Sequence, residues 1–145
     1  MTPSRRDLCI IMLAASAFAT LFSLSFVATP VKFLAADVPI AHLLAVGRVT
    51  FRASLAAESA LLTALLLTTR GRLRWLVFGT GAILLVQWLI LMPRLDERTL
   101  ARMAGTILEP SSLHYWWIVL DIGRLGIYAL ILRKGLLGVR RTHSN

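Results

Sequence analysis

Three ionisable residues, Glu58, Asp121 and Arg124, lie in stretches of sequence that are otherwise apolar and long enough to cross a bilayer. A charge at the centre of a membrane helix costs roughly 2.5–3.5 kcal/mol on insertion scales, whereas a leucine returns only about 0.3–0.6 kcal/mol. Such groups need partners, so we predict that Arg124 pairs with Glu58 or Asp121. The pair has two interpretations: it fixes the register of the helices, or it belongs to a ligand or proton path.

Other polar side chains recur on single faces of the same stretches. His114, Asp121 and Arg124 are separated by seven and three residues, which places them on one side of a helix. We predict that Arg52, Gln87 and His114 line a shallower polar pocket that opens outward. The candidate ligand-binding or ion-path residues are therefore Arg52, Glu58, Gln87, His114, Asp121 and Arg124.

Motifs of soluble catalysis and of metal binding are missing from the sequence. It contains no Gly-rich phosphate loop, no Ser/His/Asp arrangement and no paired cysteines, since Cys9 is the single cysteine. His42 and His114 are the candidates for a two-histidine haem or copper site, but neither has a second metal-type ligand at close spacing. We expect no catalytic residues, no bound metal and no cofactor.

The elements that hold these residues are indicated by composition. Of the 145 residues, 57% are hydrophobic and 16% are charged, and the mean hydropathy is +0.74, whereas soluble domains carry roughly 45–50% apolar and about 25% charged residues. Four apolar runs are long enough to span a bilayer. We predict an all-α fold in one domain, residues 1–145: a bundle of four transmembrane helices at about 8–29, 49–69, 73–92 and 113–132.

The segment before the second span is expected to be helical. Asp37 followed by Pro39 predicts a helix start. A helix from there to Thr69 would be about 46 Å long, which exceeds a hydrocarbon core of about 30 Å. We therefore expect this helix to protrude, to tilt, or to break near Gly47.

The segment between the third and fourth spans predicts an amphipathic helix. Apolar residues recur at helical spacing at Leu100, Met103, Ala104, Ile107 and Leu108, and polar residues fill the opposite face. We predict a helix of about three turns that lies flat at the outer interface and ends at Pro110. It would serve as a lid or brace between two spans, or as a gate over a substrate pathway.

The basic residues predict the orientation of the chain. If the spans alternate, one side of the membrane holds nine of the 16 basic residues and a single acid, Asp7, and so has a net charge of +8. The nine basic residues are Arg5, Arg6, Arg70, Arg72, Arg74, Arg133, Lys134, Arg140 and Arg141. This asymmetry places both termini in the cytoplasm of a cell with the protein in its inner membrane. The expected partners are anionic lipid headgroups rather than nucleic acid.

The first span is predicted to remain in the mature protein. Arg5 and Arg6 before an apolar run resemble a twin-arginine export signal, and Ala17–Ala19 has the composition of a cleavage site. The apolar run nevertheless continues about ten residues past Ala19, beyond a signal core of about 7–15 residues. A stripe of small residues on this helix, Ala15, Ala19 and Ser23, could support a homodimer or a partner membrane protein.

The layout as a whole resembles a known group. Phe26, Pro30 and Phe33 at the end of the first helix and Gly47 and Phe51 entering the second resemble the bacterial domain-of-unknown-function group related to animal transmembrane protein 205. A polar residue near the end of the third helix (Gln87), then Pro93 and an amphipathic segment 94–109, and a histidine opening the last helix (His114) also look similar. That group would have asparagine at position 87, and the Asp121/Arg124 pair is not part of its pattern. The resemblance implies fold and location more than chemistry.

Two functions are compatible with these features. The first is a non-enzymatic accessory or small transport-related inner-membrane protein that handles a solute through an outward-facing polar pocket. The alternative is a membrane enzyme of the oxygenase or quinone/haem-linked redox type acting on a lipophilic substrate, with His114, Asp121 and Arg124 at its site. A similarity to small four-helix membrane oxygenases of the anthrone-oxygenase type implies the second function.

Overall fold

The computed structural model describes residues 4–35 and 37–143, and within them the chain is helical throughout, apart from turns and short connections. Its elements follow in the order α1 (Arg5–Phe22), η1 (Ser23–Ala28), α2 (Thr29–Val31), η2 (Lys32–Leu34), α3 (Ile40–Thr68), α4 (Arg72–Val86), η3 (Gln87–Leu91), α5 (Met92–Met103) and α6 (Leu113–His143). Here η1 and η3 are π-helical and η2 is a 3-10 turn.

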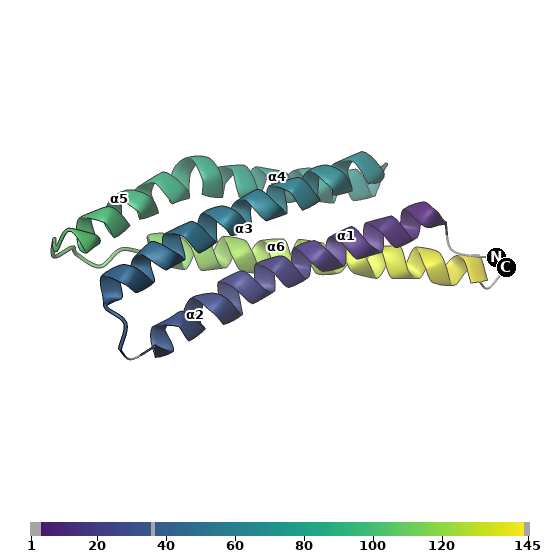
Figure 1. Ribbon diagram of the computed structural model, residues 1–145. Helices are drawn as coiled ribbons and strands as arrows, with labels where there is room; N and C mark the ends of the chain where they lie inside the picture. Colours follow the sequence, from purple (N-terminus) through teal and green to yellow (C-terminus); the bar gives the residue numbers. More distant parts are fainter. Residues whose placement is uncertain (1–3, 36, 144–145) are drawn as a thin grey trace.

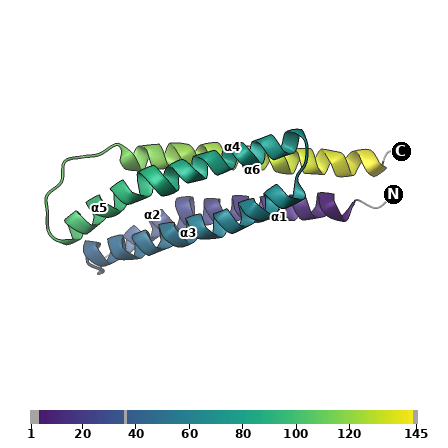
Figure 2. The ribbon, with the colours of Figure 1, turned by 90° about the horizontal axis from the view of Figure 1, so that it is seen from above.

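These elements join into four long helices that run up and down in sequence (Figure 1). The first, α1, packs against α3 and α6, and α4 packs against the same two helices. Both ends of the chain lie at the same end of the bundle, as Figures 1 and 2 show. We call this the proximal end, and the end that carries α2, α5 and the start of α3 the distal end.

All four helices are long and apolar enough to cross a membrane: Arg5–Leu34, Ile40–Thr68, Arg72–Met103 and Leu113–Val139. The predicted all-α four-helix bundle is therefore confirmed. Its interior contains charged and polar groups beside an apolar core, while large apolar side chains cover its outside. Glu58 and Gln87 have no exposed surface, whereas Leu67, Trp75 and Leu89 are largely exposed. A chain surrounded by lipid has this arrangement, because apolar side chains lose nothing by facing hydrocarbon while charged ones need protein partners.

The first two helices differ from the expected bounds. The first continues through Pro30 to Leu34, because the π-helical segment η1 lets the backbone pass the proline without a break. The second does not break at Gly47, and the expected cap at Asp37 is wrong. Its N-cap is Pro39, whose backbone is extended (ψ 136°) and whose carbonyl accepts from the His42 and Leu43 N–H groups, so the helix starts two residues later than expected.

The predicted amphipathic segment is helical, but its bounds are wrong. It begins at Met92 as a continuation of α4 and η3 and ends at Met103, so Ile107 lies outside the helix and is 99% exposed. Gly105 ends it in the left-handed region (φ +84°). The Thr106 N–H donates to the Ala101 carbonyl and the Gly105 N–H to the Arg102 carbonyl, which is the pattern of a Schellman C-cap.

The stripe of small residues on α1 faces away from the bundle. Ala15, Ala19 and Ser23 are exposed, while Ala14 and Ala17 are buried against the other helices. The face that packs inside the bundle is therefore a different one from the face that we expected to support a homodimer.

Candidate functional site

Arg124 lies at the centre of the bundle, between two carboxylates. It is 1% exposed, and its Nη1 atom lies 2.7 Å from Glu58 Oε2 while its Nη2 atom lies 2.5 Å from Asp121 Oδ1. Asp121 is on the preceding turn of α6, and Glu58 belongs to α3. The predicted pairing of Arg124 with Glu58 or Asp121 is confirmed, and the guanidinium in fact bridges both.

Two neutral side chains complete this buried cluster. The Gln87 amide donates from Nε2 to Asp121 Oδ1 at 2.8 Å and to the Trp117 carbonyl at 3.4 Å. The Tyr128 hydroxyl donates to Glu58 Oε2 at 3.4 Å. Gln87 is the first residue of the π-helical segment η3, so the cluster joins three of the four long helices. One guanidinium thus faces two carboxylates, which gives the cluster a net charge of −1 when both carboxylates are ionised.

The cluster also retains hydrogen-bonding capacity that no protein atom uses. Among the described residues, four buried polar atoms have no partner. Three belong to the cluster, Glu58 Oε1, Gln87 Oε1 and Arg124 Nε, and the fourth, Trp117 Nε1, belongs to the residue whose carbonyl accepts from Gln87. Two of them are acceptors and two are donors. Buried polar atoms are rarely left unpaired. The packing of the three helices around Arg124 thus leaves some of these donors and acceptors without a protein partner.

A second ionic contact joins α3 to α5 near the distal end. Asp96 on α5 accepts from Arg48 Nε at 2.8 Å and also pairs with Arg52, one helical turn further along α3. The sequence analysis did not single out Asp96. The i, i+4 spacing of Arg48 and Arg52 places both on one face of α3 and was the available signal for a shared carboxylate partner. Asp96, however, lies in the amphipathic segment, whose polar residues the prediction assigned to a face exposed to solvent.

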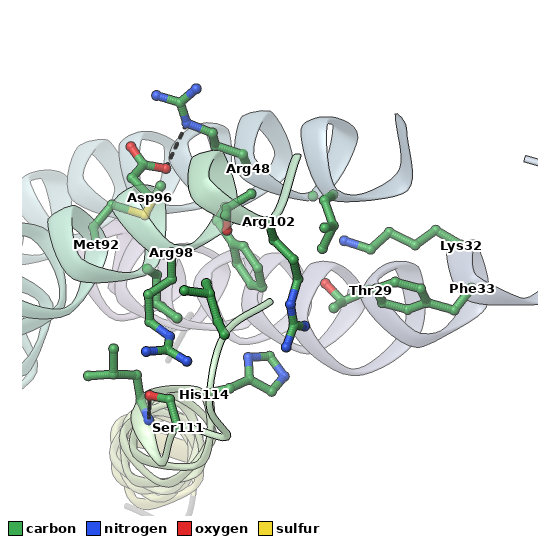
Figure 3. A pocket seen from close by; sticks show the side chains of 17 residues that line it. Thr29, Lys32, Phe33, Arg48, Met92, Asp96, Arg98, Arg102, Ser111 and His114 are labelled. Carbon is green, nitrogen blue, oxygen red and sulfur yellow. Dashed lines mark hydrogen bonds and ion pairs between the residues drawn. The ribbon is translucent and has the colours of Figure 1, made fainter. Parts of the chain in front are cut away.

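A cavity of about 320 Å³ lies beside this contact, between the distal ends of all four long helices (Figure 3). We call it the distal pocket. Its apolar wall comes mainly from Phe33, Leu44, Phe51, Met92, Leu95, Leu108 and Leu113. Its charged or titratable side chains are Lys32, Arg48, Asp96, Arg98, Arg102 and His114. The pocket is thus apolar in surface and basic in charge.

Of the three residues that we expected to line such a pocket, only His114 does so. Gln87 lies in the buried cluster instead, where its amide donates to Asp121. Arg52 is half-exposed and is held by Asp96 outside the cavity. The pocket is instead lined by the basic side chains of Lys32, Arg98 and Arg102, among others. The sequence analysis missed Lys32 because it assumed that the first helix ends before it.

His42 and His114 do not line a common site. His42 is exposed in the first turn of α3 and does not line the distal pocket, whereas His114 does. In the described part of the chain, no group of three or more His, Cys, Asp or Glu side chains is arranged to hold a metal ion.

Comparison of the chain with protein-family models, with curated proteins and with solved structures finds no match. The resemblance to the group related to transmembrane protein 205 stays a prediction. The candidate site therefore rests on geometry: a closed ionic cluster in the middle of the bundle and an open basic pocket at its distal end.

Proposed function

We propose that the chain is a non-enzymatic inner-membrane protein, accessory to or part of a small transport system, whose distal pocket faces outward and receives a solute. The single observation that carries this proposal is the distal pocket, because its walls come from all four long helices and two of its cations, Lys32 and Arg102, pair with no carboxylate among the described residues. Pockets between the helices of bundles are common sites for small ligands.

The outward orientation is supported by the charge distribution. The proximal end carries both termini and the turn between α3 and α4, which together hold the nine basic residues with a net charge of +8. Segments rich in arginine and lysine stay in the cytoplasm. Arg70, Arg72 and Arg74 in that turn would then contact anionic lipid headgroups of the inner leaflet.

Cysteine labelling in whole cells tests this orientation. Cys9 is the only cysteine, so Cys9→Ser supplies a background for the single substitutions Thr106→Cys in the distal connection and Ser4→Cys at the proximal end, both at exposed positions. A membrane-impermeant maleimide should label Thr106→Cys in intact cells and Ser4→Cys only after permeabilisation. The reverse pattern would exclude the proposed orientation.

The role of the pocket is tested by complementation. In a strain lacking the protein, at least one class of solute should be distributed differently between cells and medium than in the wild-type strain. Untargeted mass spectrometry of both fractions measures this distribution. Wild-type protein and a proximal control, Arg72→Gln, should restore the profile, whereas Lys32→Gln/Arg102→Gln should not. Full restoration by the pocket variant would contradict the proposal, and a Soret band or stoichiometric metal in the purified protein would favour the enzyme alternative.

A further inference from the structure

The distal pocket has more positive charge than its own carboxylate can neutralise. Four basic side chains line it, from three different elements, against the single carboxylate of Asp96. The lining therefore carries a net charge of +3 before His114 is counted. An anion bound in the cavity would remove this repulsion.

Two of the three arginines that line the pocket already have protein partners. Arg48 is held by Asp96, and Arg98 donates to the backbone carbonyl of Glu109. Among the described residues, no carboxylate pairs with Lys32 or Arg102. Figure 3 shows Lys32, Arg102 and His114 reaching from η2, α5 and α6 into the same space. These are the groups that remain available to a ligand.

The backbone is arranged so that Lys32 can enter the pocket. A Cβ atom on Gly47 would overlap Lys32 Nζ, so the ammonium group occupies the space that any other residue at position 47 would fill. The same nitrogen lies 5.0 Å and 5.7 Å from the ring centroids of Phe33 and Phe51, which is within reach of a cation–π contact. The glycine therefore holds a place for a cation in the pocket wall.

We propose that the distal pocket binds a phosphate group that carries an apolar substituent, as the headgroup of an anionic lipid or as a soluble phosphomonoester. Guanidinium groups match phosphate oxygens with paired hydrogen bonds, and the ammonium of Lys32 adds a point charge. A group with up to two negative charges neutralises the net charge of the lining more fully than a single carboxylate does.

The dimensions of the pocket agree with such a ligand. Its volume of about 320 Å³ is at the lower end of ligand sites, which run from roughly 300 to 1,000 Å³. Phe51, Met92 and Leu113 provide an apolar wall next to the cations. The cavity thus has room for one phosphate and a short apolar part rather than for a large organic molecule.

Binding to purified, detergent-solubilised protein tests this inference. The phosphate site depends on the proposed function in one respect only, which is the side of the membrane from which the ligand enters. Binding in detergent is independent of that side. Failure of binding therefore counts against the phosphate site alone, whereas failure of the maleimide labelling counts against the proposed function alone.

Native mass spectrometry should show one phosphatidic acid retained per chain, in preference to phosphatidylcholine and laurate. Lys32→Gln/Arg102→Gln should weaken this binding at least tenfold, and Arg94→Gln, which removes an exposed cation of α5 that does not line the distal pocket, should leave it within twofold. Equal losses in the pocket variant and in Arg94→Gln, or equal retention of phosphatidylcholine or laurate, would overturn the proposal.

Two further measurements sharpen the test. Gly47→Ala should weaken phosphatidic acid binding without lowering the thermal midpoint by more than a few degrees, because only the flexible end of Lys32 must move. Competition by glycerol 3-phosphate would identify a site open to soluble phosphomonoesters, and retention of the lipid against it would identify a headgroup site. Both of these results support a phosphate site, whereas an unchanged affinity in Gly47→Ala would overturn the role assigned to Lys32.

Discussion

Arg124 is the cation between two buried carboxylates, so the effect of its loss can be derived from the charges that remain. Replacing it with methionine leaves Glu58 and Asp121 buried with only the neutral donors Tyr128 and Gln87. Removing one partner of a buried ion pair costs about 3–5 kcal/mol. We expect Arg124→Met to lower the free energy of unfolding by an amount in this range.

Glu58→Gln should be milder for the same reason. Arg124 then keeps Asp121, so the cluster becomes one cation with one anion, and the new amide oxygen can still accept from Arg124 Nη1. We expect a loss of about 1.5 kcal/mol, the lower end of the range for hydrogen bonds to charged groups. In the Arg124→Met background the sign should reverse, because there Glu58→Gln removes an uncompensated carboxylate and should stabilise the protein.

The free energy of unfolding can be measured by titrating detergent-solubilised protein with SDS and following helix content. Glu97→Gln is the matched control, since Glu97 is exposed on α5 and the same change there should alter stability by less than about 0.5 kcal/mol. Additive effects of Arg124→Met and Glu58→Gln, with no change of sign, would refute the reasoning, because independent sites add and coupled charges do not.

Four other variants test the packing and the helix ends of the bundle. Gly135→Ala should destabilise the bundle by about 1–2 kcal/mol in the SDS titration, because the added Cβ atom would lie 2.8 Å from Ile11 Cγ1. At Gly126 an added Cβ atom meets nothing within 4 Å, so Gly126→Ala should be neutral or stabilising by up to about 1 kcal/mol. Gly105→Ala should cost about 1–2 kcal/mol, because an alanine is strained at φ +84°, and an unaltered SDS midpoint would contradict the left-handed cap. Asp96→Asn should lower the free energy of unfolding by about 1 kcal/mol, because its arginine partners are partly exposed. It should also speed amide hydrogen exchange in α5, whereas the control Glu97→Gln should not. Equal exchange rates in both variants would exclude Asp96 as the link between α3 and α5.

The second helix illustrates why local capping signals misplace a boundary. Asp37 has the side chain of a good N-cap, yet α3 starts only after Pro39. The opposite case occurs at Gly105, a C-cap signal that the prediction did not use, because it followed the apolar periodicity through Ile107 to Pro110. Periodicity continues across a helix end because it records which residues are apolar, whereas the end is decided by backbone conformation at one residue.

The amino-acid sequence by itself determined the four apolar spans and the need of Arg124 for a carboxylate, because the transfer of charges and of long apolar runs between water and lipid depends on residue type alone. Only the tertiary structure decided that Gln87 joins Asp121, that Asp96 links α3 to α5, and that Lys32 enters a pocket over Gly47. These contacts depend on how far each helix extends and how it is rotated. π-Helical segments in the first and third long helices change both quantities by a fraction of a turn, which no spacing of residues along the chain records.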